Sequence, residues 1–300
     1  MQTDSPKTIQ NAYRYCEAVT KSHAKSFHFA ARFLPRHKRE QVFPIYAFCR
    51  HVDDEIDEIR DGDEKSAVAA VGRWRSRLEG VYSDSYDPTT EVDEGHRNVF
   101  IAWRHMLAHY KIPLEHPLDL IKGVVQDTHK KRYETFDELY EYSYRVASTV
   151  GLMSSEILGY SDRIALDHAE SMGIGMQLTN ILRDIKEDAE RGRIYIPRED
   201  LERFRIDESE IISGTMSDRF REMMVFQVAR AREYYSRGEQ GIAMLDADSR
   251  FTVLLASRVY GRILDQIERM DFDVFSRRAS TSKVQKLMMV PGIWLEARGL

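Results

Sequence analysis

The 300-residue sequence is poor in the residues on which several protein classes depend. Its only two cysteines, Cys16 and Cys49, are too few for a disulfide framework or a thiolate metal site. No apolar run approaches the roughly 18–20 residues that span a bilayer, and the first ten residues lack the apolar segment of a signal peptide. We therefore expect a protein of a reducing compartment, most simply the cytoplasm.

The sequence also lacks an excess of positive charge and any sustained β pattern. A net charge of −5 and a pI near 6.1 give no reason to expect nucleic acid as a partner. Glycine occurs only 16 times, and no run of β-branched residues alternates with polar ones. The 42% hydrophobic content suffices for a sizeable core. The pattern predicts a nearly all-α fold, and length alone leaves one or two domains open.

Helical periodicity divides the chain into long segments separated by polar turns. The predicted helices cover residues 6–21, 37–59, 65–81, 97–110, 114–130, 136–159, 165–191, 216–245 and 250–270. Residues 23–27 should form a break, 61–64 a polar turn and 83–94 an acidic loop. Pro44 must lie in the first turn of its helix or kink it. The apolar tail, residues 283–300, fits a packing helix better than a membrane-surface contact.

One stripe of the helix predicted at residues 165–191 is polar where a core-facing stripe would be apolar. Gly173, Gln177, Asn180, Asp184 and Asp188 share it at 100° per residue. The glycine should leave space above the helix. This arrangement predicts one wall of a polar cavity.

A second polar stripe lies on the helix predicted at residues 37–59. Tyr46, Arg50, Asp53 and Asp57 are spaced 4, 3 and 4 residues apart. Each helix thus offers two carboxylates one turn apart, which repel unless a cation lies between them. Hard oxygen ligands suit Mg²⁺, with Mn²⁺ as a substitute, and Mg²⁺ completes its shell with substrate phosphates. A single pair of carboxylates of this kind is more simply explained as the solvent-exposed face of a helix, but here the pattern occurs in two helices.

Arginines without an obvious acidic partner accompany both stripes. They are Arg50, Arg183, Arg191 and Arg193. Guanidinium groups bind phosphate oxygens bidentately, although each alone is more simply part of a surface salt bridge. Together they favour an anionic substrate.

Long stretches of the chain resemble the squalene and phytoene synthase family, the head-to-head prenyl transferases. They are SFHFAARFLPRHKREQVFPIYAFCRHVDDEIDE, YSYRVASTVGLMSSEILG, GMQLTNILRDIKEDAERGRIYIPRE and, as in bacterial phytoene synthases, RVYGRILDQIERMDFDVFSRRA. The resemblance covers about residues 15–278 and leaves a tail at 279–300. It implies one isoprenoid-synthase domain over residues 1–300, an all-α bundle around a central cavity.

The resemblance also assigns the site. It implies that Asp53, Asp57, Asp184 and Asp188, together with Asn180, bind Mg²⁺, and that Arg50 and Tyr142 act in catalysis. The substrate-binding positions that it implies are His23, Lys25, Ser26, Phe27, Ala31, Tyr46, Gln177, Asn180, Arg183, Arg193, Tyr195 and Tyr260. A core tyrosine is an equally good interpretation of Tyr142 from the residues alone.

The implied reaction joins two molecules of geranylgeranyl diphosphate to phytoene through a cyclopropyl diphosphate, without NADPH. Fifteen-carbon synthases of the family have a phenylalanine where this chain has Ala31, so a longer tail is expected here. Ser148 replaces a glycine usual in the family and should add bulk near the cavity.

Several alternatives remain open. A farnesyl diphosphate enzyme making dehydrosqualene, squalene or presqualene diphosphate is one, and a non-catalytic assembly factor is another, although such factors lose motif aspartates. Chain-elongating prenyl transferases and terpene cyclases share the fold but not these motifs. We also expect transient contact with the inner membrane face, since the product is a hydrocarbon.

Overall fold

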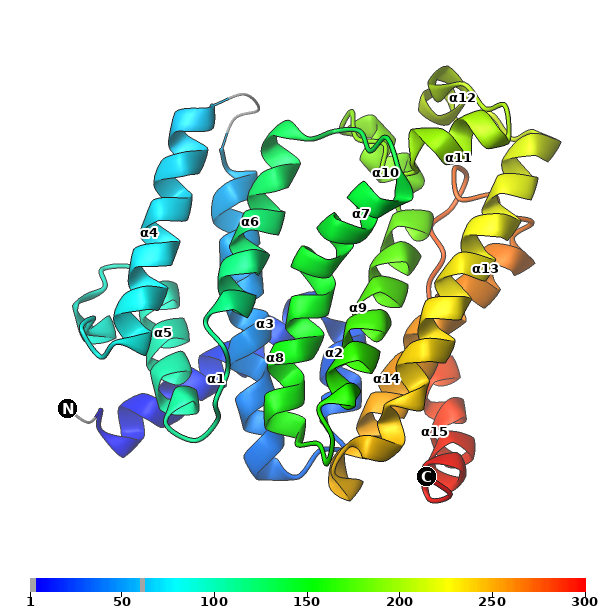
Figure 1. The fold of residues 1–300 in the computed structure, drawn as a ribbon. Coiled ribbons are helices and arrows are strands. Elements are labelled where there is room, and N and C mark those ends of the chain that lie inside the picture. Colours follow the sequence, from blue (N-terminus) through cyan, green and yellow to red (C-terminus); the bar gives the residue numbers. More distant parts are fainter. Residues whose placement is uncertain (1–3, 60–62) are drawn as a thin grey trace.

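A computed structural model of the chain describes residues 4–59 and 63–300, and these residues form helices without any strand (Figure 1). In the first half lie α1 (Pro6–His23), α2 (Lys25–Ala31), α3 (Arg36–Asp57), α4 (Glu64–Tyr82), η1 (Pro88–Thr90), α5 (Glu94–Leu107), α6 (Glu115–His129) and α7 (Phe136–Ser143). The second half contains η2 (Tyr144–Ser148), α8 (Thr149–Leu158), α9 (Ile164–Arg183), α10 (Ile185–Glu190), α11 (Arg198–Arg203), α12 (Glu208–Ser213), α13 (Asp218–Gln240), η3 (Ile242–Met244), α14 (Ala247–Arg269) and α15 (Lys283–Ala297). The predicted all-α class is confirmed.

Local sequence sets the helix starts. Ser5 caps α1 by accepting the Thr8 N–H at 3.1 Å, and Pro6 follows at the first turn, where its missing N–H costs nothing. Asp93 caps α5 by accepting the His96 N–H at 2.7 Å. Ser282 and Gln285 form a reciprocal capping box at α15. These caps satisfy amide groups that no helical carbonyl reaches.

Two large apolar clusters hold most of the described helices together. The first joins α1, α3, α4, α5 and α6 around the fully buried rings of Phe48, Trp74 and Trp103. The second joins α9, α13 and α14 around Phe220, Met224 and Leu264. Helix α9 packs along α13, and α3 packs against α8 beside it (Figure 1). The space between the clusters is therefore bounded by α3, α8 and α9.

Several boundaries differ from those predicted. Pro44 is buried in the interior of α3, not in its first turn, so it removes one helical hydrogen bond there. The break predicted at residues 23–27 is confined to Ala24, because α2 begins at Lys25. The helix predicted at residues 165–191 stops at Asp184 and restarts as α10. Part of the turn predicted at 61–64 lies outside the described residues.

Gly173 does not leave open space. A Cβ added there would lie 2.5 Å from Cα of Ser148, so α9 and η2 meet backbone to backbone. The Ser148 hydroxyl donates to the Glu170 carbonyl at 2.7 Å and packs against α9. The Ser148 side chain therefore lies within the contact between η2 and α9. The segment 144–148 is a π-helical turn inside the long helix predicted at 136–159.

The tail forms a helix, as predicted. Met289, Val290 and Ile293 of α15 pack against a small cluster centred on α14. Among the described helices, none is both long and apolar enough to cross a membrane.

Candidate active site

The two aspartate pairs lie at the same end of the bundle. Helices α3, α6 and α9 all finish at the end where α10 lies, at the top of Figure 1. Asp53 and Asp57 come from the last turns of α3, whereas Asp184 ends α9 and Asp188 lies in α10. The charge of Asp127, near the end of α6, acts on both Asp53 and Asp188. Carboxylates from three helices therefore converge there.

The first pair is held by an arginine one turn earlier. Arg50 Nη1 donates to Asp53 Oδ2 at 3.0 Å, and its Nε donates to Asp54 Oδ2 at 3.0 Å. The side chain of Asp53 is 43% exposed, and Asp57 is exposed as well. Arg50 thus leaves the Asp57 carboxylate and one oxygen of Asp53 turned to solvent or substrate.

The second pair has its own cations. Arg183 Nε donates to Asp184 Oδ1 at 2.7 Å, and Arg278 Nε donates to the same oxygen at 2.8 Å. Burial alone would raise the pKa of Asp184, but these hydrogen bonds outweigh it and hold the pKa at about 2. The expectation that the arginines lack acidic partners is therefore wrong for Arg50 and Arg183. Arg278 was not predicted as a site residue.

Two of the motif carboxylates hold protons unusually tightly. Burial and the neighbouring charge of Asp57 raise the pKa of Asp53 to about 6. Burial, with the charges of Asp184 and Asp127, raises the pKa of Asp188 to about 7. Mutual repulsion of this kind is what a bound cation relieves.

Asp127 is a functional candidate that the sequence analysis missed. Its carboxylate accepts hydrogen bonds from Tyr142 Oη at 2.7 Å and Tyr195 Oη at 2.8 Å. Burial raises its pKa, although both tyrosines and the charge of Arg193 oppose that. Asp127 has no carboxylate one turn away in the sequence, so no helical stripe pointed to it.

Tyr142 and Tyr195 are buried against each other, with ring centroids 5.3 Å apart. The core interpretation of Tyr142 is therefore partly right, but its hydroxyl reaches a carboxylate rather than a backbone carbonyl. Arg193 interacts electrostatically with Asp127, Asp57 and both tyrosines. Tyr142, Tyr195, Arg193 and Asp127 therefore form one group at the charged end of the bundle.

Below the aspartates, α9 and α14 present amide and phenol groups. Tyr260 Oη donates to Asn180 Oδ1 at 2.7 Å, and Asn180 Nδ2 donates to Gln177 Oε1 at 3.2 Å. Tyr46 of α3 interacts with the charges of Arg50 and Asp53 and with Tyr260, and burial raises its pKa to about 12. The residues of both predicted stripes thus face one another.

The residues around α2 lie beside the C-terminal helix. Lys286 of α15 donates to Ser26 Oγ at 2.6 Å, and its charge interacts with that of Lys25. Burial and then Lys25 lower the pKa of Lys286. His23 ends α1 with an exposed side chain. The sequence analysis missed Lys286, which lies in the tail beyond the motifs.

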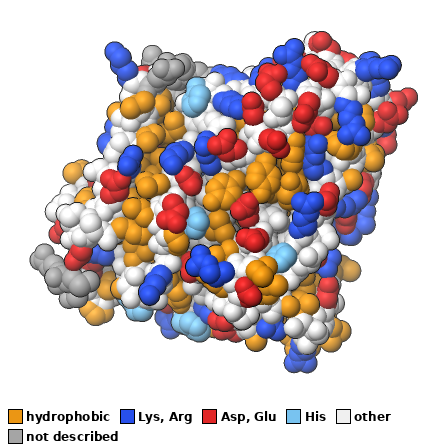
Figure 2. Space-filling view, viewed as in Figure 1, with side chains coloured by type: hydrophobic (Ala, Val, Ile, Leu, Met, Phe, Trp, Pro, Cys, Tyr) orange, Lys and Arg blue, Asp and Glu red, His pale blue; other side chains and the backbone are white. Residues whose placement is uncertain are grey.

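An apolar cavity of about 190 Å³ lies at the opposite end of these helices. Phe27 and Ala31 of α2, Val150 of α8, and Met172 and Met176 of α9 line it. Phe27 stacks on Tyr46 with centroids 6.1 Å apart and so connects the cavity to the polar end. The site therefore has a charged end and a hydrocarbon-lined end. Side chains of both charges gather over α10, α11 and α12, and hydrophobic ones form a band over the middle (Figure 2).

Comparisons with known proteins agree with this arrangement. The sequence model described as squalene/phytoene synthase matches residues 20–285. The chain is 38% identical to the 15-cis-phytoene synthase of Synechocystis sp., over 98% of this chain and 87% of the relative. It is 36% identical to the chloroplastic phytoene synthase 3 of Zea mays, over 96% and 67%.

Solved structures give the same family of folds. A dehydrosqualene synthase in complex with ligand superposes with a TM-score of 0.87 and 26% identity, over 98% of this chain and 99% of that one. The squalene synthase HpnC from Alicyclobacillus acidocaldarius superposes with a TM-score of 0.79 and 27% identity, over 89% and 97%.

Proposed function

The chain belongs to the squalene/phytoene synthase family, and we propose that it condenses two molecules of geranylgeranyl diphosphate head to head to give phytoene. It is a prenyltransferase enzyme. Relatives named phytoene synthase match it at 36–38% identity over nearly its whole length. The reaction proposed here supplies the hydrocarbon from which carotenoids are made.

The observation that carries the proposal is the division of the site into a charged end and an apolar end. Asp53, Asp57, Asp184 and Asp188 lie at one end, and the 190 Å³ apolar cavity lies at the other. A prenyl diphosphate has the same two parts. Its charged head fits the aspartate and arginine end, and its tail fits the cavity.

The donor set fits magnesium. Carboxylates from α3 and from the α9–α10 junction supply hard oxygens. Burial and then neighbouring carboxylates raise the pKa values of Asp53 and Asp188, although Arg50 and Arg193 oppose the rise, and a bound cation would favour the ionised forms. We propose that Asp53, Asp57, Asp184 and Asp188 hold Mg²⁺, with Asn180 nearby. When bound, Mg²⁺ would neutralise developing charge on the leaving diphosphate.

The chain's own residues then bind and orient the first substrate. Arg50 and Arg183 already lie against motif aspartates, so a diphosphate bound at this end would meet guanidinium donors without large movement. Lys25 and Lys286 add positive charge beside Ser26. This charge lowers the barrier for the allylic C–O bond to break, leaving an allylic carbocation and free diphosphate.

The apolar half shapes the following steps. Holding the two tails together lets the alkene of the second substrate attack the cation, and loss of a proton gives the cyclopropyl diphosphate. Its own ionisation, rearrangement and loss of a second proton give phytoene. The apolar lining of the cavity disfavours the entry of water that would quench the cations. Tyr142 donates its hydroxyl proton to Asp127, which holds that hydroxyl in one orientation.

The first experiment incubates the full chain with Mg²⁺ and labelled geranylgeranyl or farnesyl diphosphate, with and without NADPH, and identifies the hexane-soluble products. Phytoene from the twenty-carbon substrate without NADPH is expected. Asp53→Asn and Asp184→Asn should each lose at least about 100-fold in rate, several kcal/mol of transition-state stabilisation. A thirty-carbon product would refute the proposed length of the substrate but not the head-to-head condensation. If neither substrate were consumed, the assembly-factor alternative would be favoured.

Ala31 tests the tail length directly, because its methyl group lines the cavity. Ala31→Phe should reduce the rate with geranylgeranyl diphosphate by at least about tenfold, since the ring fills space that the longer tail needs. The rate with farnesyl diphosphate is the internal control and should fall less. Equal loss with both substrates would contradict the assignment of Ala31 to chain length.

We also propose that α15 contacts a lipid surface transiently. One face of this helix packs on the protein, while Val284, Leu287, Met288 and Leu295 are 59–76% exposed on the other. These four share a stripe at helical spacing. The product is a hydrocarbon, so a lipid-contacting helix beside the cavity wall would shorten its exit.

Liposome co-sedimentation at low salt tests this contact. The chain should sediment with the liposomes, and Leu287→Ser with Leu295→Ser should release it. Val225→Ser removes an exposed apolar residue of similar accessibility from α13 and serves as the matched control. Failure of the wild-type chain to sediment would refute the proposal.

A further inference from the structure

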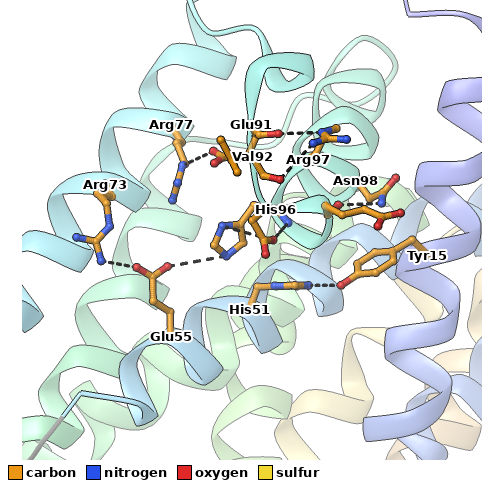
Figure 3. A network of polar contacts seen from close by, with 12 residues as sticks. Tyr15, His51, Glu55, Arg73, Arg77, Glu91, Val92, His96, Arg97 and Asn98 are labelled. Atoms are coloured by element: carbon orange, nitrogen blue, oxygen red, sulfur yellow. Dashed lines mark hydrogen bonds and ion pairs between the residues drawn. The ribbon is translucent and has the colours of Figure 1, made fainter.

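A second cluster of metal-ligand residues lies on the side of α3 that faces α5. His51 comes from α3 and His96 from the first turn of α5 (Figure 3), and Asp93 is the N-cap residue of α5. His51 and Asp53 are two residues apart in a helix, so their side chains point about 200° away from each other. The cluster is therefore separate from the aspartate site.

The three side chains converge closely. One ring nitrogen of each histidine and one carboxylate oxygen of Asp93 all lie within 4.8 Å of one another. His96 Nδ1 lies 3.8 Å from Asp93 Oδ1, which also accepts the His96 backbone N–H at 2.7 Å. The helix cap thus fixes the carboxylate against the imidazole.

Gly95 allows this approach. A Cβ at that position would lie 2.5 Å from Cε1 of His51 and 2.6 Å from the hydroxyl of Tyr15. A side chain there would displace the His51 ring and the Tyr15 hydroxyl from their present positions. The close packing of the two helices at this point brings His51 to the cap of α5.

Outer partners surround the cluster as they do in metal sites. Tyr15 Oη lies 3.0 Å from His51 Nε2 and orients that ring. Glu55 Oε2 lies 3.9 Å from His96 Nε2, while Glu55 Oε1 accepts from Arg73 at 2.5 Å (Figure 3). Among the described residues, this buried Glu55 Oε2 has no hydrogen-bond partner. A His96 ring that bound a cation through Nδ1 would present its Nε2–H to that oxygen.

We propose that His51, Asp93 and His96 bind a zinc-type divalent cation. Two imidazoles and one carboxylate form a donor set that favours Zn²⁺ over Mg²⁺, because imidazole is a borderline-soft ligand. Bonds of about 2.0–2.2 Å require the three ligand atoms to close by roughly 1 Å, which side-chain rotation supplies. Water completes the shell. The ion joins α5 to α3 two residues before Asp53 and so stabilises the fold independently of the proposed reaction.

A zinc titration of the full chain tests the proposal. Chelator-treated protein in millimolar Mg²⁺ is titrated with Zn²⁺ against a chromophoric competitor, and Co²⁺ is titrated in parallel. We expect one Zn²⁺ per chain, visible absorption from bound Co²⁺, and a Zn²⁺-dependent rise in the midpoint of thermal unfolding. His96→Gln and Asp93→Asn should each weaken binding at least about tenfold. Asn is as good an N-cap as Asp, so the second variant keeps the helix start.

Two controls separate this site from other sources of binding. His109→Gln removes an exposed histidine beyond the other end of α5 and should bind Zn²⁺ as the wild type does. Asp184→Asn removes a ligand of the aspartate site and should also leave the tight Zn²⁺ site intact. Absence of Zn²⁺ binding in the presence of Mg²⁺ would refute the proposal. So would unchanged binding in both cluster variants, or its loss in Asp184→Asn.

Discussion

At the scale of single residues, Asp127 connects the two halves of the polar site. It accepts hydrogen bonds from Tyr142 and Tyr195, and its charge acts on Asp53 and Asp188. A carboxylate with two phenol donors is held in one orientation. We infer that Asp127 fixes the orientation of the two tyrosine hydroxyls and adds negative charge that draws cations to the polar end.

Loss of the Tyr142 hydroxyl should therefore lower the stability of the protein and its condensation rate, whereas loss of the Tyr133 hydroxyl should not. Tyr142→Phe removes a donor to a buried carboxylate, which should cost about 1–3 kcal/mol in unfolding free energy and lower the condensation rate. Among the described residues, the buried Tyr133 hydroxyl has no hydrogen-bond partner, so Tyr133→Phe is the matched control. Urea unfolding and product formation would be measured for both. Equal effects of the two substitutions would contradict the role of the Asp127 pair.

Magnesium binding should weaken as the pH falls. The pKa values of about 6 for Asp53 and about 7 for Asp188 mean that at pH 6 Asp53 is half protonated and Asp188 largely protonated, whereas both are mostly ionised at pH 8. Because Mg²⁺ needs the ionised forms, its affinity should be roughly tenfold or more higher at pH 8. Calorimetric titrations at pH 6, 7 and 8 measure this change.

The same raised pKa values give the stability of the metal-free protein the opposite dependence on pH. Both folded-state pKa values lie above the ordinary 3.8, so the folded state binds more protons than the unfolded chain between about pH 4 and 7. Stability without Mg²⁺ should rise as the pH falls from 8 to 6. Asp188→Asn should reduce both dependences, and a flat profile in the wild type would contradict the assignment.

Helical spacing predicted which side chains would lie near one another, whereas their roles stay predictions. Tyr46, Arg50, Asp53, Asn180 and Asp184 share regular spacing, and the structure brings them to one end of the bundle. Asp127, Arg278 and Lys286 reach the same region from separate helices or the tail. Their approach is a property of packing, and nothing in the local spacing encodes it.

At the scale of elements, the contact of α9 with η2 fixes the wall of the cavity. Gly173→Ala would place a methyl group 2.5 Å from Cα of Ser148, which is backbone and cannot move aside cheaply. The expected loss is about 1–3 kcal/mol of unfolding free energy, from overpacking. Gly72→Ala is the matched control, because nothing lies within 4 Å of the added methyl on exposed α4. It should stabilise the protein by up to about 1 kcal/mol.

Thermal and urea unfolding of the two variants would test this contact. If the Gly173→Ala and Gly72→Ala variants had similar stability, the backbone of η2 would be able to move away from the added methyl group. The backbone contact would then not be rigid.

Hydrophobic periodicity predicted the positions of the long helices but not the points at which a helix breaks. The long pattern from residue 165 to 191 continues through Asp184, where the backbone leaves helical geometry at φ −106° and ψ 14°. Arg183 and Arg278 both bind that carboxylate, so tertiary contacts compensate the break. The short helices α11 and α12 were also missed, since six residues give too few repeats for a periodic pattern.

At the scale of the molecule, the site lies where the two apolar clusters meet. Asp53 and Asp57 belong to a helix of the first cluster, whereas Asp184 and Asp188 belong to the helices of the second. The apolar cavity likewise has walls from both, with Val42 on one side and Met172 on the other. A ligand held by both aspartate pairs would therefore cross-link the two clusters.

Magnesium and inorganic diphosphate should accordingly stabilise the fold more together than the sum of their separate effects. At about 100 times the dissociation constant, ligand binding adds about 2.7 kcal/mol, which for a chain of this size raises the unfolding midpoint by roughly 4 °C. Thermal unfolding with Mg²⁺, with diphosphate and with both measures the effect. Asp184→Asn, which removes one carboxylate of the second pair and leaves the first pair intact, should abolish the joint gain. A purely additive response in the wild type would mean that the two pairs do not act on one ligand.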